Sequence, residues 1–158
     1  IVSKPKNFGE RGEDVVTLSS FNSDEEFQNY LHENRNVLAQ PLIRDLYTGG
    51  ENSLIFLRGR FIYGVNKFTG DFKVNASEGT MYARHFPGEK ELDIARRAIS
   101  DWPTPFDYVR VDMVNSENPL IMEVEMVNPS FYESRLGLMP EVSRELEIFY
   151  RRVLEERI

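Results

Sequence analysis

The chain has 158 residues, of which 41% are hydrophobic and 28% are charged, a balance typical of one globular domain or of two small lobes that share a core. Its net charge of −7 argues against a nucleic-acid-binding surface, because phosphate backbones attract clustered basic residues. The absence of cysteine excludes disulfides and thiolate metal sites, and it fits a reducing cytoplasm. No apolar run is long enough to span a membrane, and no signal peptide is visible.

The first 43 residues predict short strands around one helix. Residues 1–5 predict a strand that stops at a proline and leaves Lys4 near its end. The polar loop that follows contains two glycines, so its backbone N–H groups and Lys4 could contact a phosphate, although a hairpin tip in solvent is an equal alternative. Ser23 and Glu26 have capping-box spacing and predict the start of a structural helix that ends near residue 34. Residues 37–43 predict another strand, which a proline interrupts.

The middle of the chain predicts a hairpin that ends in a lysine. Its first arm, residues 53–57, is apolar on both faces, which favours the middle of a covered sheet. Lys67 ends the second arm; a lysine there usually extends to water from an edge, but it can also point into a pocket. Beyond it, Lys73 and Asn75 would share one face of an extended segment, either as part of a solvated edge strand or as the lining of an anion site.

Residues 107–129 predict the central feature of the chain, two strands joined by a turn. Side-chain alternation places four charged residues on one face of this pair: Arg110, Asp112, Glu123 and Glu125. Buried like charges repel unless a cation lies among them, so we interpret the pattern as a site for a hard divalent cation, to which Asn128 adds an oxygen. The alternative is a surface hairpin with its acids in water. We favour the metal site, because the other face of both strands is too apolar to be peripheral.

The remaining segments predict helices, one from residue 88 to about residue 102 and one from residue 140 onward. Helices between hairpin-linked strands indicate an α+β fold, with a mixed, mostly antiparallel sheet and helices on its outer face. His32 and His85 show neither metal-ligand spacing nor a nucleophile context, so the sequence does not suggest a catalytic triad.

In this order the segments resemble the ATP-grasp superfamily, in particular its ribosomal-protein glutamate ligase and prokaryotic glutathione synthetase branch. The resemblance extends from Lys4 to about Phe131. Four segments match in the order of the family: Ser3-Lys4-Pro5 with its glycine loop, Gln40-Pro41-Leu42-Ile43 with Gly50-Glu51, Gly70-Asp71-Phe72-Lys73-Val74-Asn75, and Arg110-Val111-Asp112 with Glu125 and Asn128. The third is similar to a Gly-Asp-Phe-Arg-x-Asn signature.

The resemblance implies an ATP-grasp fold and an ATP- and Mg²⁺-dependent carboxylate–amine ligase that forms an acyl phosphate. It implies that Lys4 and Lys67 bind the phosphates of ATP. The backbone near Gln40 and Leu42 would recognise adenine, and Glu51 would contact the ribose.

For the reaction itself, the resemblance implies two further groups of residues. Two magnesium ions, or manganese in their place, would be held by Asp112, Glu125 and Asn128. The γ-phosphate and the acyl phosphate would be faced by Lys73, Asn75 and Arg110. Such a transfer depends on positioning and charge neutralisation, so it needs cations more than a nucleophile.

The sequence also departs from the family pattern. Glu125 and Asn128 are three positions apart, where the family has a spacing of two. Either a bulge re-aims Asn128, or Glu123 and Glu125 bind the metal without it. Lys67 and Lys73 stand where arginine is common. An alternative function is therefore a non-catalytic ATP-grasp-like nucleotide-binding or scaffolding module, and a plain metal-binding or structural domain ranks third.

Because the chain begins with Ile-Val in a strand-like run, we expect it to be a fragment of a longer protein. Residues 1–40 would form part of the central ATP-grasp lobe and residues 41–158 the C-terminal lobe, with an N-terminal substrate domain absent. The partners would be ATP, a small carboxylate and an amine acceptor. We expect the fragment alone to be inactive, and a homodimer of the full-length protein is left open.

Overall fold

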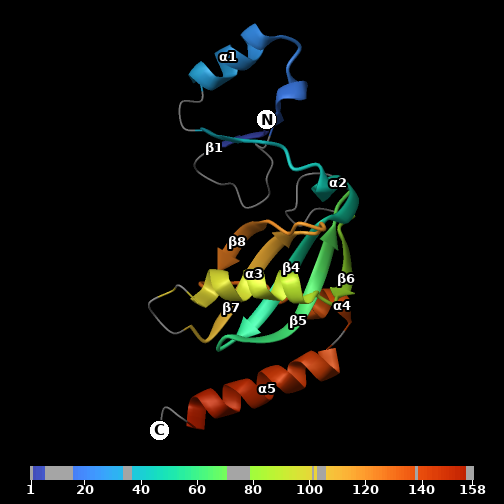
Figure 1. Ribbon diagram of the computed structural model, residues 1–158, viewed down its shortest axis with the longest axis vertical. Helices are drawn as coiled ribbons and strands as arrows, with labels where there is room; N and C mark the ends of the chain where they lie inside the picture. The colour runs from blue at the N-terminus through green and yellow to red at the C-terminus, as the bar shows by residue number, and fades with distance from the viewer. Residues whose placement is uncertain are drawn as a thin grey trace.

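The structure is a computed structural model that describes residues 2–5, 16–33, 37–70, 79–100, 102, 106–137 and 139–155. The strands of this part form two antiparallel sheets, a small sheet near the N-terminus and a larger one after it (Figure 1). Within the described residues, no helix has the length and apolar character needed to cross a membrane.

The small sheet has the order β2-β1-β3, with β1 (Val2–Pro5) between β2 (Val16–Thr17) and β3 (Val37–Gln40). A short 3₁₀ helix, η1 (Leu18–Ser20), leads toward α1 (Asp24–Glu33). The predicted cap is present, because the Ser23 hydroxyl accepts a hydrogen bond from the Glu26 amide at 3.1 Å. The Glu26 carboxylate in turn accepts from the Asn22 amide at 2.8 Å, one residue earlier than a standard capping box.

The larger sheet has the order β6-β5-β4-β7-β8, and all of its described strand pairs are antiparallel. Its strands are β4 (Glu51–Leu57), β5 (Arg60–Phe68), β6 (Met81–His85), β7 (Tyr108–Val114) and β8 (Ile121–Glu125). Every residue of the central strand β4 is buried, as expected for a strand that is covered on both faces. The predicted hairpins at β4–β5 and β7–β8 are confirmed.

One face of the larger sheet packs against α3 (Glu89–Ser100). The core between them contains buried apolar side chains of both layers: Leu54, Phe56, Leu92, Ala95, Ile99, Val109, Val111 and Met113. Phe61 also packs here, although strict alternation along β5 predicts it on the face of Lys67. A register shift between Ile55 and Phe56, opposite this part of β5, accounts for the difference.

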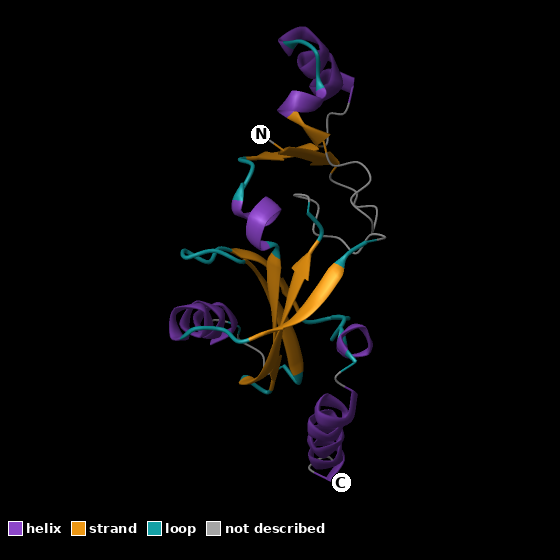
Figure 2. Ribbon diagram, turned by 90° about the vertical axis from the view of Figure 1, so that its right-hand side faces the viewer, coloured by secondary structure: helices purple, strands orange, loops and turns teal. Residues whose placement is uncertain are grey.

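The opposite face packs against α4 (Glu133–Leu136) and α5 (Met139–Glu155), so helices lie on both sides of the sheet (Figure 2). Here Ile55, Tyr63 and Val65 are covered in part by Leu136 and Leu146. The α+β fold with a mostly antiparallel sheet is confirmed, while α4 was not predicted from the sequence.

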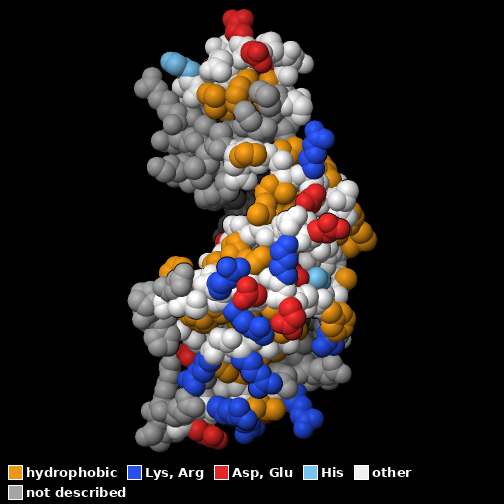
Figure 3. All heavy atoms as spheres, viewed as in Figure 1, with side chains coloured by type: hydrophobic (Ala, Val, Ile, Leu, Met, Phe, Trp, Pro, Cys, Tyr) orange, Lys and Arg blue, Asp and Glu red, His pale blue; other side chains and the backbone are white. Residues whose placement is uncertain are grey.

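The outward faces of α3 and α5 carry mixed charges, visible as blue and red side chains in Figure 3. Arg97 pairs with Asp93 one turn earlier on α3, at 3.2 Å. Arg151 pairs with Glu147 in the same way on α5, at 2.8 Å. The other side of α3 is buried at Leu92, Ala95 and Ile99, which is the amphipathic pattern read from the sequence, whereas the described apolar residues of α5 are half-buried or exposed.

Two consecutive glycines, Gly49 and Gly50, allow the end of α2 (Asp45–Gly49) to pack closely against the larger sheet. Gly50 has a φ of 73°, and a Cβ atom there would collide with the backbone carbonyl of Lys67. A Cβ atom at Gly49 would collide with the carbonyl of Asn115. The Gly49 carbonyl accepts hydrogen bonds from the side-chain amides of Asn66 and Asn115, each at 2.9 Å. Both glycines are therefore required by close backbone approach directly before β4 begins.

Candidate functional site

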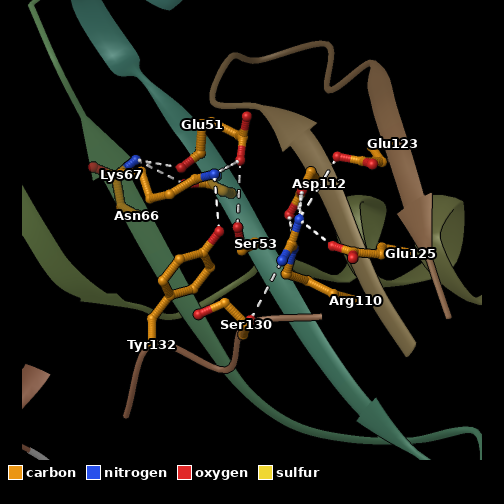
Figure 4. A network of polar contacts seen from close by, with 11 residues as sticks. Glu51, Ser53, Asn66, Lys67, Arg110, Asp112, Glu123, Glu125, Ser130 and Tyr132 are labelled. Atoms are coloured by element: carbon orange, nitrogen blue, oxygen red, sulfur yellow. Dashed lines mark hydrogen bonds and ion pairs between the residues drawn. The ribbon is translucent and has the colours of Figure 1, made fainter. Parts of the chain in front are cut away.

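Charged side chains of four strands gather on the face of the sheet opposite α3 (Figure 4). The group, called here the charged cluster, consists of Glu51 and Ser53 of β4, Lys67 of β5, Arg110 and Asp112 of β7, Glu123 and Glu125 of β8, and Tyr132. The antiparallel register brings them together, since it places Glu51 opposite Lys67, Arg110 opposite Glu125 and Asp112 opposite Glu123.

Lys67 and Glu51 form a buried ion pair at one side of the charged cluster. Lys67 is 5% exposed and Glu51 is 2% exposed, and the lysine ammonium contacts Oε1 of the carboxylate. Burial raises the pKa of Glu51 to about 7, nearby Asp112 adds to this effect, and Lys67 opposes it. Burial also disfavours the charge on Lys67, but Glu51 and Asp112 outweigh it and raise the pKa of the ammonium. Lys67 therefore stays protonated, while Glu51 can gain or lose a proton near neutral pH.

Arg110 lies at the centre of the other side, where three carboxylates converge on its guanidinium. Its Nε and Nη2 donate to the two oxygens of Asp112 at 2.9 and 2.8 Å in a bidentate pair. Nη2 also lies 2.7 Å from Glu125 Oε2 and 3.6 Å from Glu123 Oε2. Burial disfavours the charge of Arg110, but Asp112 and its hydrogen bonds outweigh burial and raise the pKa of the guanidinium. Burial and the proximity of Asp112 also raise the pKa of Glu123.

Tyr132 joins the two sides of the charged cluster. Its ring centroid lies 5.1 Å from Lys67 Nζ and 5.4 Å from Arg110 Cζ, within the range of cation–π attraction. Its hydroxyl accepts a hydrogen bond from Lys67 Nζ at 3.2 Å. The backbone just before Tyr132 is held by Tyr63, whose hydroxyl donates a hydrogen bond to the Phe131 carbonyl at 2.6 Å. Tyr132 has a φ of 57°, a left-handed conformation that is uncommon for a residue with a bulky side chain.

Five of the residues predicted for a site lie together in this cluster: Glu51, Lys67, Arg110, Asp112 and Glu125. Asn128 lies beyond the end of β8 and is exposed. Glu123, which belongs to the alternative metal set, lies directly across from Asp112 in the β7–β8 pair. The described register shift in this pair falls between Asp112 and Met113, not beside Asn128.

The other predicted residues lie elsewhere or outside the described part. Gln40 is exposed at the end of β3, and Leu42 is half-buried in the connection toward α2. The backbone at Lys4 belongs to β1, and its side chain lies outside the described part. Lys73 and Asn75 lie outside the described residues. The predicted phosphate loop, residues 6–15, lies outside them as well.

A second polar network, on the α3 side of the same strands, was not predicted from the sequence. The side-chain amide of Asn52 donates to Glu91 Oε1 at 2.9 Å and to Asn115 Oδ1 at 3.1 Å. Asn66 donates to Asn52 Oδ1 at 2.9 Å, and His85 Nε2 lies 2.8 Å from Glu91 Oε2. The network ties α3 to the strand residue that directly follows Glu51. The available signal was the polar pair Asn52-Ser53 in a strand that is otherwise apolar.

The acids of the charged cluster have the donor chemistry of a hard divalent cation. Carboxylate oxygens are the ligands that Mg²⁺, Mn²⁺ and Ca²⁺ prefer. Across the part of the chain that the structure covers, no three Asp, Glu or His side chains are arranged as a preformed metal site. Asp112, Glu123 and Glu125 instead point at Arg110, whose charge occupies the position between them. The carboxylate oxygens are therefore suitable ligands for such an ion. In this structure the cation between them is the guanidinium of Arg110.

No protein-family model matches the sequence, and no match was found among curated proteins. Among solved structures, the chain is similar to D-cycloserine synthetase DcsG, with 20% identity and a TM-score of 0.62 over 84% of this chain and 49% of that one. It is also similar to the D-alanine–D-alanine ligase from Bacillus anthracis complexed with ATP, with 18% identity and a TM-score of 0.60 over 99% and 54% of the two chains. A third similar structure is the ATP-grasp ligase PsnB complexed with minimal precursor, with 12% identity and a TM-score of 0.52 over 86% and 42%.

The chain spans about half the length of these proteins. At identities of 20% or less, the similarity establishes the fold, and the narrower branch named from the sequence stays a prediction. The antiparallel larger sheet, with helices packed on its two faces, agrees with these matches. The chain therefore has an α+β ATP-grasp fold.

Proposed function

We propose that the protein to which this chain belongs is an ATP- and Mg²⁺-dependent carboxylate–amine ligase, for which this chain supplies nucleotide-binding residues. The observation that carries the proposal is the charged cluster, in which two buried cations and four carboxylates meet on a fold shared with ligases. One of the similar structures is a ligase complexed with ATP.

In this proposal the cationic side chains bind and orient phosphate. Lys67 offers a compact ammonium, which suits a phosphate oxygen, and the planar fork of Arg110 suits the γ-phosphate and the acyl phosphate. Lys4 from β1, together with Lys73 and Asn75, would add contacts to the same phosphates. The ring of Tyr132 contacts both Lys67 and Arg110 and so holds the two cations near each other.

Acidic residues supply the metal ligands in this proposal, namely Asp112 and Glu125, with either Glu123 or Asn128. Mg²⁺ held by these residues would supply positive charge against the negative charge of the phosphates. The backbone near Gln40 and Leu42 would lie against adenine. A contact of Glu51 with ribose would require this carboxylate, which is 2% exposed and paired with Lys67, to become accessible.

The proposed reaction has two transfers. A carboxylate oxygen of the substrate attacks the γ-phosphorus, the bond to the β–γ bridging oxygen breaks, and ADP leaves with that electron pair. The amine nitrogen then attacks the acyl carbon, phosphate leaves, and the nitrogen loses a proton. Both steps move negative charge between oxygens, so the task of the chain is to hold cations at fixed positions.

The test uses the full-length protein with ATP, Mg²⁺ and panels of small acids and amines. ADP and phosphate should be released together, in amounts that require both substrates. Calorimetry should show ATP binding that Lys67→Met weakens by at least tenfold. Arg97→Met is the matched control, because it removes an exposed cation on α3 and should leave binding unchanged. Absence of ATP binding by the full-length protein would refute the proposal.

The second candidate is a non-catalytic nucleotide-binding or scaffolding module. The pairing of Asp112, Glu123 and Glu125 with Arg110 favours it, because these acids already have a cationic partner within the chain. This candidate predicts ATP binding that is indifferent to Mg²⁺, with no turnover for any acid and amine pair. The two candidates are separated by repeating the calorimetry with and without Mg²⁺.

A further inference from the structure

We propose that Arg110 is a placeholder cation, which occupies the place of the divalent metal ion in the free protein and leaves the carboxylates when that ion binds. The inference rests on the proposed function and deepens it, since it makes metal binding the event that releases Arg110 toward phosphate. Metal ion and guanidinium are then competitors for one set of oxygens.

The guanidinium stands at the point where the acids converge. Nη2 of Arg110 lies 2.8 Å from Asp112, 2.7 Å from Glu125 and 3.6 Å from Glu123, so one nitrogen is close to oxygens of all three acids. A Mg²⁺ ion draws such oxygens to about 2.1 Å, which leaves no space for that nitrogen among them. Both oxygens of Asp112 are also engaged by Nε, at 2.9 and 3.0 Å. With the bond from Nη2, Arg110 thus makes three hydrogen bonds to Asp112, and a metal ion bound by the same oxygens would compete with them.

Arg110 is also surrounded by more acid than one guanidinium needs. One carboxylate suffices to pair it, and here Asp112 already does so with two parallel hydrogen bonds. Glu123 and Glu125 add negative charge that a single arginine does not balance. Acids packed together in this way are stable only with a cation among them. A purely structural ion pair would not require the additional two.

Both cations have a route in or out of this position. The metal ion can enter from the β8 side, since the side chains of Glu123 and Glu125 are 58% and 28% exposed while that of Asp112 is 3% exposed. A guanidinium that leaves the carboxylates would still have a partner beside it, because its Cζ already lies 5.4 Å from the centroid of the Tyr132 ring, which also faces Lys67 (Figure 4). Arg110 would then be free to face a triphosphate, next to Lys67, which contacts the same Tyr132 ring.

The test measures Mn²⁺ affinity of the full-length protein, without nucleotide, by electron paramagnetic resonance. Arg110→Met should bind Mn²⁺ at least tenfold more tightly than the wild type, because the competing cation is gone. Arg97→Met removes the same charge from an exposed position on α3 and controls for net charge. An unchanged or weaker Mn²⁺ affinity for Arg110→Met relative to this control would overturn the inference.

Thermal unfolding gives a second measurement, because Arg110→Met leaves three carboxylates without their cation and makes the folded state depend on metal. Mn²⁺ should raise the melting temperature of Arg110→Met more than that of the wild type. If the variant is unfolded alone, Mn²⁺ should restore its fold, and failure to do so overturns the inference. A protein that binds ATP with Mg²⁺ but shows Mn²⁺ affinity independent of Arg110 would retain the proposed function and lose only this inference. Failure to bind ATP at all would instead refute the proposed function.

Discussion

Glu51→Gln should change how the stability of the chain depends on pH. Burial, with a further effect of Asp112, raises the pKa of Glu51 from its ordinary value of 4.5 to about 7 in the folded chain. Between these values the unfolded chain has lost a proton that the folded chain retains, so this group makes folding less favourable as pH rises. At about 1.36 kcal/mol per pH unit, the loss from pH 4.5 to pH 7 amounts to roughly 3 kcal/mol.

The variant removes this dependence because glutamine does not titrate. Below pH 7 Glu51 is mostly protonated in the folded chain, so its replacement by neutral glutamine changes the contact with Lys67 by an amount that is nearly constant with pH. This constant difference does not affect the slope when the free energies of unfolding of the variant and the wild type are compared across pH. The free energy of unfolding of the variant, relative to the wild type, should therefore increase by about 3 kcal/mol from pH 4.5 to pH 7. Urea unfolding followed by circular dichroism at several pH values measures it.

Val65→Ala is the control for general destabilisation. Val65 is fully buried on the same face of the sheet, and its truncation should cost about 2 kcal/mol at each pH without changing the slope. If the difference between Glu51→Gln and the wild type stays constant with pH, Lys67 keeps Glu51 ionised throughout. Burial would then not be the dominant influence on this carboxyl group.

Three further substitutions test the surroundings of the charged cluster by urea unfolding. Gly50→Ala should destabilise the chain more than Gly59→Ala; their φ angles are 73° and 77°, but a Cβ atom would meet the backbone of β5 at Gly50 and nothing at Gly59. Equal losses would contradict the collision. Tyr63→Phe should cost about 1 kcal/mol, because it deletes the 2.6 Å hydrogen bond to the Phe131 carbonyl, and a neutral result would show that this bond is not needed. Asn52→Leu should cost about 1–3 kcal/mol, since it leaves a buried carboxylate of α3 without its amide donor, and a stabilised variant would refute that role.

The parts of the fold that the sequence predicted are those with a local period. Arg110 and Asp112 alternate with apolar neighbours in β7, and this alternation alone was enough to place them on one face of the sheet. Capping at Ser23 was readable for the same reason, because its partner is three residues away. Local spacing thus predicted the elements and the acidic face.

The parts that the sequence did not predict depend on distant partners or on backbone conformation. Tyr132 accepts a hydrogen bond from Lys67, 65 residues earlier, and its own φ of 57° is not readable from the sequence. Asn52 meets Glu91 because α3 packs on the sheet, which no spacing between them encodes. The pairing of Arg110 with Glu125, and the position of Glu123 opposite Asp112, likewise follow from cross-strand register. The alternation of side chains predicted the shared face but not the contacts between these groups, and the metal site stays a prediction.

The pairing of β4 with β7 has a consequence for the order of folding. Glu51 and Lys67 belong to the β4–β5 hairpin, while Arg110, Asp112 and Glu125 belong to the β7–β8 hairpin. Each hairpin forms by closing a short loop. Pairing β4 with β7 closes a much longer loop that contains β5, β6 and α3, so it costs more conformational entropy and is expected to be the slower step. Each hairpin thus contains its own ion pair before the two hairpins meet, Lys67 with Glu51 in the first and Arg110 with Asp112 and Glu125 in the second. The larger sheet can close without burying a bare ion, and the charged cluster is completed in the same step.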